Sequence, residues 1–218
     1  MVLWRTGLVS FGQGLFYGAG AYTVGILPQY IAVSDALLLT LLSAAVAGLL
    51  AYALGFLLRR YREIFFAMLC MAFSMIFYGV LVKSEKLGST DGFNVVPTSF
   101  IGYEPASPEQ QQMLLYALTA AIAWLSCLFV NRYLLTTMGR LTRAIRDNET
   151  SAAAAGKNIE KFRIQTFVIG CAVMGIAGGL SAHYFRFLSP TATDPLLVTF
   201  LVWVMLMAGG SGNNKGAI

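Results

Sequence analysis

Charged residues are scarce in this sequence, and the common sequence signatures of enzymes are missing from it. Asp, Glu, Lys and Arg make up 11% of the 218 residues, whereas about a quarter of a typical soluble domain is charged. The chain has no GxSxG nucleophile elbow and no HExxH pair. It also lacks a Walker A motif, because the nearest stretch, GGSGNNKGAI, has no glycine directly before Lys215. We therefore expect no enzyme and no cofactor bound by this chain, so any ATP that drives it binds to another protein.

Residues that bind metals or form disulfides are equally few. Cys70, Cys127 and Cys171 lie in apolar stretches and form no CxxC pair, which favours buried small side chains over a redox or metal role. The single histidine, His183, has no Cys, His, Asp or Glu neighbour at metal-ligand spacing, and a zinc site needs three or four protein ligands. The sequence therefore predicts no metal site.

Ionisable residues are also missing from the interior of the long apolar stretches. Carriers that couple transport to protons or sodium often place such residues inside the membrane as relays. Their absence disfavours a carrier that works alone, although sodium sites can be built from backbone carbonyls at broken helices. A stand-alone secondary carrier or channel for a small solute therefore stays open as an alternative function.

Long apolar stretches are what the chain has in abundance. Hydrophobic residues make up 57% of it, and its mean hydropathy is +0.69. A helix needs about 20 apolar residues to cross the hydrocarbon core of a bilayer, which is about 30 Å thick. We predict one all-α domain over residues 1–218, a polytopic transmembrane helical bundle embedded in a lipid bilayer. Its segments, about six in number, are expected at residues 7–28, 36–58, 64–82, 113–130, 165–185 and 195–210.

The charges that are present fall unevenly between the predicted loops. With the N-terminus inside, all 15 Lys and Arg residues except Lys83, Lys86 and Arg186 lie on the cytoplasmic side. The outer loops are acidic on balance, so the positive-inside rule predicts that both ends are cytoplasmic. Because the net charge of +5 is divided among short loops, without a contiguous element that could read a nucleic-acid groove, we expect no nucleic-acid partner.

Two of the predicted loops are long enough to do more than connect helices. The outer loop, about residues 83–112, is rich in Gly, Ser and Pro and is typical of irregular or partly re-entrant structure. The inner loop, about residues 131–163, contains a helix-favouring run in which Leu141 and Ile145 share one face. Four alanines at 152–155 permit close approach of another backbone, and Gly156 is suited to end the helix. The pattern predicts a short cytoplasmic helix that docks onto a partner; the alternative is a solvated basic loop.

The first predicted segment, GLVSFGQGLFYGAGAYTVG, is unusually rich in glycine. Gly14, Gly18 and Tyr22 follow one another at intervals of four residues, which favours close packing against a neighbouring helix. Ser10 and Gln13 allow a second interpretation, a pathway or a break in the helix, because an amide in hydrocarbon must find a partner or water. The two interpretations are compatible, and both are kept.

Five stretches, in this order, resemble the branched-chain amino acid ABC transporter permease family, particularly its LivM-like branch. They are GLVSFGQGLFYGAGAYTVGIL, RRYREIFFAMLCMAFSMIFYGVLV, GSTDGFNV, GRLTRAIRDNETSAAAAGKNIEKFRIQTF and GIAGGLSAHYFRFLSP. The fourth is the most specific and is similar to the cytoplasmic loop with which the family contacts its ATPase. Gln13, and Cys70 where the family more often has threonine, leave the substrate class open, and Glu63 stands where glycine is more usual. Relative to the family, the chain is expected to be truncated at both ends.

The resemblance implies a multi-pass permease subunit of the bacterial inner (plasma) membrane. Its role would be in an ATP-driven ABC importer for branched-chain amino acids or related small amides, including urea. A periplasmic substrate-binding protein would deliver the solute to a pair of permease subunits, this chain and a second one. Two cytoplasmic ABC ATPase subunits would bind the ATP and drive the pore between its two states.

The same resemblance assigns roles to residues of the inner loop. The side chains expected to pack in a groove of the ATPase are Leu141, Ile145, Ala152, Ala153 and Ala155. Those expected to fix the orientation at its rim are Arg143, Arg146, Asp147 and Glu149, with Gly156 ending the segment. Candidates for the solute pathway are polar residues inside apolar segments, namely Ser10, Gln13, Tyr22 and Ser74.

Overall fold

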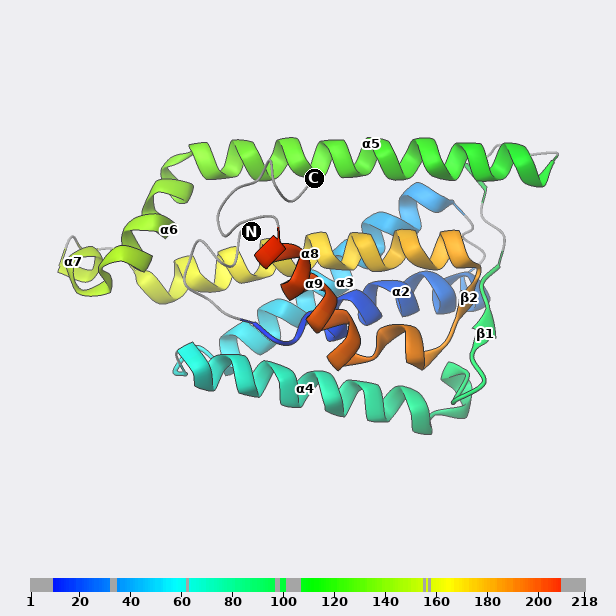
Figure 1. Cartoon of the computed structure of the whole chain (residues 1–218), viewed down its shortest axis with the longest axis horizontal. Helices are drawn as coiled ribbons and strands as arrows, with labels where there is room; N and C mark the ends of the chain where they lie inside the picture. The colour runs from blue at the N-terminus through cyan, green and yellow to red at the C-terminus, as the bar shows by residue number, and fades with distance from the viewer. Residues whose placement is uncertain are drawn as a thin grey trace.

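The described part of the chain is mostly helical, and its long helices run roughly along the long axis of the molecule (Figure 1). The computed structural model describes residues 10–31, 35–61, 63–96, 99–100, 107–154, 156 and 158–208. The long helices are α2 (Gln13–Tyr30), α3 (Ala36–Leu57), α4 (Glu63–Lys83), α5 (Pro108–Leu135) and α8 (Ile159–Phe185), and the shorter ones are α6 (Thr137–Asp147), α7 (Glu149–Ala154) and α9 (Pro195–Ala208). Two 3-10 turns, η1 (Glu85–Leu87) and η2 (Pro190–Thr193), accompany a small antiparallel ribbon of β1 (Phe93–Asn94) and β2 (Phe187–Leu188). The predicted all-α polytopic bundle is confirmed.

Within the part of the chain that the structure describes, four helices are long and apolar enough to cross a membrane: Ala36–Leu57, Ile64–Lys83, Glu109–Leu135 and Ile159–Phe185. They correspond to the second to fifth predicted segments, but α5 and α8 begin earlier than expected. Their starts are set by capping side chains, since Ser107 accepts a hydrogen bond from the backbone N–H of Gln110 and Asn158 accepts one from that of Lys161. Hydropathy does not register such caps, so it located the apolar part of each helix and missed its polar beginning.

The first predicted segment becomes α2, which lies at the centre of the bundle. Nearly all of its residues from Gln13 to Gly25 are buried, and it packs against α3, α4, α8 and α9. Because protein surrounds this helix, it needs no continuous apolar surface toward lipid, and its glycines and Gln13 are tolerated. Residues 7–9 of the predicted segment lie outside the described residues.

Glycines of α2 and α8 bring the two backbones into contact. A Cβ atom on Gly20 of α2 would overlap the carbonyl oxygen of Gly175 in α8. On the other side of α2, a Cβ atom on Gly14 would lie 2.8 Å from the Cα atom of Pro195. The close packing that the glycine spacing predicted is therefore present, and small residues make it possible.

The sixth predicted segment, 195–210, is represented by α9. Its 14 described residues are fewer than the roughly 20 needed to span a bilayer core. The helix packs on α2 and α4 and lies in front of the bundle in Figure 1. Residues 209 and 210 lie outside the described residues.

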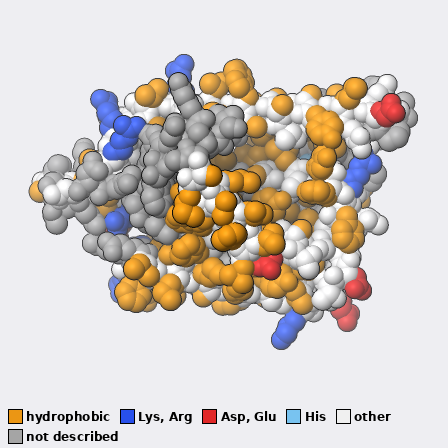
Figure 2. All heavy atoms as spheres, viewed as in Figure 1, with side chains coloured by type: hydrophobic (Ala, Val, Ile, Leu, Met, Phe, Trp, Pro, Cys, Tyr) orange, Lys and Arg blue, Asp and Glu red, His pale blue; other side chains and the backbone are white. Residues whose placement is uncertain are grey.

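The two ends of the bundle differ in charge. The end that carries α6 and α7 has exposed basic residues on several helices, namely Arg59, Arg132, Arg140, Arg143 and Lys161. The opposite end has the exposed acidic residues Glu85, Asp91 and Glu109, together with exposed Lys83. Figure 2 shows the same separation, with basic side chains mainly at the α6 end and acidic ones mainly toward the other. Basic residues that are far apart in the sequence therefore lie near one another at the α6 end of the bundle.

Candidate functional site

All four predicted pathway residues are buried inside the bundle. Ser10 and Gln13 lie at the start of α2, Tyr22 lies in its second half, and Ser74 lies in the middle of α4. The hydroxyl oxygen of Ser10 accepts a hydrogen bond from the backbone N–H of Gly12 at 3.3 Å. The side-chain amide of Gln13 donates to the carbonyl oxygen of Ser10 at 3.4 Å. These two hydrogen bonds leave Oε1 of Gln13 without a partner among the described residues.

Three of these residues bury a polar atom that has no hydrogen-bond partner among the described residues. The atoms are Oε1 of Gln13, the hydroxyl oxygen of Tyr22 and Oγ of Ser74, whose residue is 0% exposed. Leaving such an atom unpaired costs about 1–3 kcal/mol, and native proteins contain few of them. Their position on α2 and on a helix packed against it places unused hydrogen-bonding capacity at the centre of the bundle.

The face of α4 that carries Ser74 packs against the first half of α2. One turn before Ser74, the carbonyl oxygen of Cys70 would lie 3.0 Å from a Cβ atom on Gly12. One turn after it, the ring of Phe77 would lie 3.1 Å from a Cβ atom on Gly18. Because residues three to four apart share one face of a helix, Ser74 faces the stretch of α2 between these glycines. The structure therefore brings Ser74 toward Ser10 and Gln13. Tyr22 lies about 13 Å from Gln13 along the axis of α2, at 1.5 Å per residue.

Two buried threonines extend this polar region and were not singled out from the sequence. Thr193 in η2 donates its hydroxyl to the carbonyl oxygen of Pro190 at 2.8 Å. Thr199 in α9 donates to the carbonyl oxygen of Phe11 at 3.1 Å and so ties α9 to the start of α2. Both are hydroxyl residues within or beside an apolar segment, the criterion that had selected Ser74. We call the set Ser10, Gln13, Ser74, Thr193 and Thr199 the polar seam.

An apolar cavity of about 430 Å³ lies beside the polar seam. Thr199 supplies its polar edge, and α9 provides most of its walls. The lining residues are Phe11, Met71, Leu196, Thr199, Phe200, Trp203 and Met207. A polar strip next to an apolar wall suits a small amphipathic solute, because binding sites are mostly apolar with few polar groups.

The outer loop closes the far end of α2. Strand β1 pairs with β2 so that Phe93 lies opposite Leu188 and Asn94 opposite Phe187. The ring of Phe93 meets that of Tyr22 edge to face, with centroids 6.0 Å apart, and a Cβ atom on Gly25 would lie 2.9 Å from it. The predicted irregular loop thus contributes one strand to a short ordered ribbon of β1 and β2, which we call the clasp. The clasp covers the end of α2 at which Tyr22 lies.

The inner loop forms a helical hairpin of α6 and α7 at the opposite end of the bundle (Figure 1). Ile145 in α6 is 3% exposed and packs with Ala152 in α7 and with Ile159 at the start of α8. Leu141 and Phe162 pack against this cluster. The predicted short helix is present, and two of the apolar side chains expected to pack in the ATPase, Ile145 and Ala152, pack against each other within the hairpin. Docking of the hairpin onto a partner stays a prediction.

The exposed surface of the hairpin is accordingly smaller and more polar than expected. Arg143, Ala153 and Gly156 are exposed. Gly156 has a φ of +73°, the left-handed backbone conformation that suits a residue at the end of a helix. Ala155 and the side chains of Arg146, Asp147 and Glu149 lie outside what the structure describes. Among the described side chains of the predicted docking set, Arg143, Ala153 and Gly156 are the exposed ones.

Comparisons with known proteins cover the full chain. Residues 1–218 match the family described as branched-chain amino acid transport system / permease component. The high-affinity branched-chain amino acid transport system permease protein LivM of Escherichia coli (strain K12) is 26% identical over 244 residues, which cover 100% of this chain and 56% of that protein. The chain therefore spans about half the length of this relative.

Two archaeal proteins of Methanocaldococcus jannaschii are also similar. Its probable branched-chain amino acid transport permease protein LivM is 43% identical over 95 residues, covering 44% of this chain and 28% of that protein. Its probable branched-chain amino acid transport permease protein LivH is 25% identical over 228 residues, covering 98% of this chain and 68% of that protein. No solved structure matches the chain.

Proposed function

Because this chain belongs to the family of branched-chain amino acid transport system permease components, we propose that it is the membrane-spanning permease subunit of an ATP-driven ABC importer. Its substrates would be branched-chain amino acids or related small amides, including urea. The observation that carries the proposal is the group of buried polar atoms without partners on α2 and α4. A solute that passes α2 could use hydrogen-bonding capacity that the fold leaves unused.

The polar seam would form one wall of the solute pathway, and the clasp would close its outer end. The amino or amide groups of the solute could donate to Gln13 Oε1 and Ser74 Oγ, while its apolar side chain met the neighbouring cavity lined by Phe11 and Phe200. Binding in this way replaces the hydration that the solute loses, which a purely apolar passage could not do.

The hairpin of α6 and α7 would be the element through which the ATPase moves the bundle. Its own core of Ile145, Ala152 and Ile159 makes it a rigid lever, and α6 and α7 both contact α8. Because α8 is packed backbone to backbone against α2 at Gly175 and Gly20, a push on the hairpin would be transmitted to the pathway helix. Arg143, Ala153 and Gly156 would form the contact with the ATPase.

The remaining partners follow from this role. Two cytoplasmic ABC ATPase subunits would bind the ATP, a second permease subunit would complete the pore, and a periplasmic substrate-binding protein would deliver the solute. The basic end of the bundle would face the cytoplasm, in accordance with the positive-inside rule. A stand-alone carrier or channel is the competing function, and it would transport without nucleotide or partners.

The decisive experiment compares the wild-type chain with two variants, each coexpressed with the ATPase subunits and the second permease subunit and assayed with the substrate-binding protein added. Ala153→Trp alters the exposed surface of α7, and Thr90→Trp alters an equally exposed position in the outer loop. We expect wild type and Thr90→Trp to retain the ATPase on an affinity column and to support ATP-dependent uptake in proteoliposomes, whereas Ala153→Trp loses both. Uptake by the purified chain without ATP would instead establish the stand-alone carrier.

Labelling of introduced thiols tests the orientation separately. In a Cys127→Ala background, Ala153→Cys should react with a membrane-impermeant maleimide only after the cells are permeabilised, while Thr90→Cys should react in intact cells. Native Cys70 and Cys171 are buried and should give little background. Labelling of Ala153→Cys from outside intact cells would rule out contact between the hairpin and a cytoplasmic ATPase.

A further inference from the structure

Helix α5 is fastened to the bundle at two points and stands apart from it between them. Near its start, the hydroxyl oxygens of Tyr116 and Tyr184 lie 3.2 Å apart. Near its end, the hydroxyl oxygens of Tyr133 and Thr166 lie 3.1 Å apart. Between these ties, about 25 Å apart at 1.5 Å per residue, α5 contributes little to the core, since only 6% of its most apolar stretch is buried. Figure 1 shows α5 running along the outside of the bundle.

The space between α5 and the bundle forms one groove that is polar at one end and apolar at the other. Its two parts are cavities of about 630 Å³ and about 430 Å³, and Ile169 of α8 lines both. The larger part lies at the α6 end, and the smaller part lies between α3, α5 and α8. Residues of α8 at intervals of three to four line the groove from end to end, namely Lys161, Gln165, Ile169, Val173 and Ile176.

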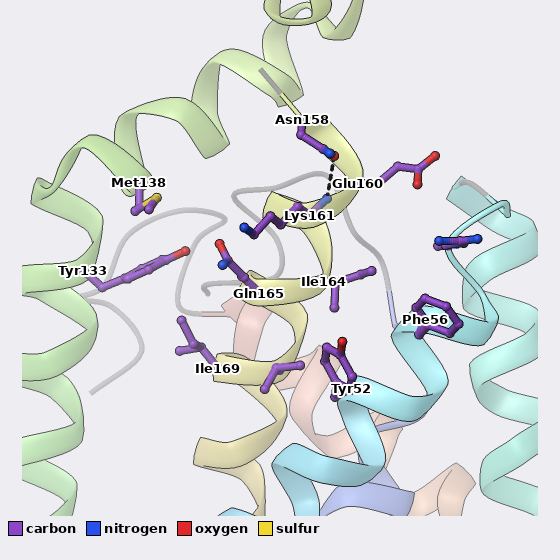
Figure 3. Close-up of a pocket in the computed structure, with 12 residues that line it drawn as sticks. Tyr52, Phe56, Tyr133, Met138, Asn158, Glu160, Lys161, Ile164, Gln165 and Ile169 are labelled. Carbon is purple, nitrogen blue, oxygen red and sulfur yellow. Dashed lines mark hydrogen bonds between the residues drawn. The ribbon is translucent and has the colours of Figure 1, made fainter. Parts of the chain in front are cut away.

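The α6 end of the groove carries positive charge and hydrogen-bond donors. Arg59 and Lys161 are both exposed there, and no ion pair among the described residues occupies either of them. The guanidinium carbon of Arg59 lies 4.5 Å from the centre of the Phe56 ring, which holds this cation beside the groove. Glu160 is the one carboxylate in the lining. In Figure 3, Tyr133 points toward Gln165 from α5, whereas Tyr52 and Phe56 face Ile164 from α3.

The other end of the groove is almost entirely apolar. Its lining consists of Leu37, Thr40, Leu41, Ile122, Leu125, Ser126, Phe129, Ile169, Ala172, Val173 and Ile176. The hydroxyl of Thr40 is already used, because it donates to the carbonyl oxygen of Ala36 at 2.7 Å. A ligand for this groove therefore combines an anionic head with a long hydrocarbon chain.

We propose that the groove binds an anionic phospholipid from the leaflet at the α6 end. Its anionic headgroup lies at the α6 end, where Arg59 and Lys161 line the groove, and one acyl chain follows α8 toward Ile176. The stretch from Lys161 to Ile176 rises about 22 Å, which exceeds half of the roughly 30 Å hydrocarbon core and so accommodates a headgroup and the chain of one leaflet. A spanning helix of a second subunit, about 30 Å long, would collide with the two tyrosine ties.

Lipid binding to the purified full-length chain tests the charged end of the groove. Native mass spectrometry in a mild detergent would compare phosphatidylglycerol with phosphatidylcholine of the same acyl chains. The double variant Arg59→Gln and Lys161→Gln removes the groove cations, and its matched control, Arg132→Gln with Arg143→Gln, removes two exposed cations at the same end that do not line the groove. We expect phosphatidylglycerol to bind the groove variant roughly tenfold more weakly or worse, while the control keeps wild-type affinity.

Equal affinity of the two variants, or equal binding of the two lipids to wild type, would overturn the proposal. Soluble glycerol phosphate should not compete at the lipid concentrations used, because the apolar half of the groove contributes to affinity. Competition by glycerol phosphate would show a free-anion site and would likewise overturn it.

A second measurement needs no variant and therefore does not depend on variant folding. Phosphatidylglycerol with a photoreactive group near the end of one acyl chain should crosslink peptides containing Ile122–Phe129 or Ile169–Ile176 in the wild-type protein. Uniform labelling of all lipid-facing helices would contradict specific binding of the lipid in the groove. Loss of these lipid adducts when the second permease subunit is bound in the assembled transporter would assign the groove to protein contact instead.

Discussion

Gly20 of α2 and Gly175 of α8 face each other so closely that a Cβ atom on Gly20 would overlap the carbonyl oxygen of Gly175. The same carbonyl accepts a hydrogen bond from the hydroxyl of Ser43 in α3 at 3.1 Å. Three helices thus meet at one peptide group, and α2 is held between the other two. This contact fixes the position of the helix that carries Gln13 and Tyr22.

Replacing Gly20 with valine should destabilise the bundle. The new side chain would be forced into the backbone of α8, and overpacking of this kind costs about 1–3 kcal/mol or more. Gly79→Ala in α4 is the matched control, because its Cβ atom would meet nothing within 4 Å. We expect a lower thermal midpoint in detergent for Gly20→Val and an unchanged or slightly higher midpoint for Gly79→Ala. Equal midpoints for the two variants would contradict backbone contact at Gly20.

Ser74→Ala should separate stability from transport. Removing a buried hydroxyl that has no partner among the described residues relieves an unpaired group, so the thermal midpoint should stay the same or rise. The uptake rate should fall, because the pathway loses a hydrogen-bonding group. Thr119→Val in α5 is a suitable control, since its exposed hydroxyl only donates to the carbonyl oxygen of Leu115 within the same helix. Wild-type uptake by Ser74→Ala would remove this residue from the pathway.

Ile145→Ala should loosen the hairpin without unfolding the bundle. Truncating a buried isoleucine costs about 2–5 kcal/mol, and the cluster with Ala152 and Ile159 is small and separate from the main core. Hydrogen exchange followed by mass spectrometry should show faster exchange of the α6 and α7 amides and unchanged exchange in α3. Ala153→Ser at an exposed position should leave all of these rates unchanged. Unaltered protection in Ile145→Ala would show that the cluster does not hold the hairpin.

A disulfide between Asn94→Cys and Phe187→Cys should form readily and lock the clasp. These residues lie directly opposite each other in the antiparallel ribbon, where Cα atoms are about 4.5–5.5 Å apart, a separation that disulfides accept. Because the clasp covers the Tyr22 end of α2, we expect oxidation to stop uptake and a reductant to restore it.

The control for this crosslink is Glu85→Cys with Phe187→Cys, which are not paired in the ribbon, both in a Cys127→Ala background. Only the Asn94 pair should crosslink, as seen by a shift in gel mobility. Full uptake by the crosslinked protein would show that solute does not pass through the clasp.

Much of the hairpin of α6 and α7 could be predicted from local sequence, but what covers its apolar face could not. The run around Leu141 and Ile145 has helical spacing, and Gly156 takes the left-handed backbone conformation expected of a terminator. The apolar face of α6 was expected to meet a partner, whereas Ile145 packs against Ala152 and Ile159. Periodicity identifies an apolar face, but it does not identify what covers that face.

The pathway candidates were predicted from polarity alone, and the structure buries all of them. Ser10, Gln13, Tyr22 and Ser74 were selected because polar groups in apolar segments need a reason to be there. Thr193 and Thr199 satisfy the same criterion and were missed, since their relation to Ser10 and Gln13 depends on α9 folding back onto α2. No local pattern contains that contact.

What the sequence by itself determined was the solvent of this protein and the asymmetry of its two ends. The length of their apolar stretches places α3, α4, α5 and α8 in lipid rather than in water. The difference in charge between successive loops is also set by the sequence and does not depend on how the helices pack. Only the tertiary structure decided that α2 is enclosed, that α5 stands apart over a groove and that Phe93 packs on the Tyr22 end of α2. The physical reason is that hydrocarbon and a protein interior are almost equally apolar, so hydropathy does not separate a lipid-facing helix from a buried one. That choice depends on contacts such as the one between Gly20 and Gly175, which join residues far apart in the chain.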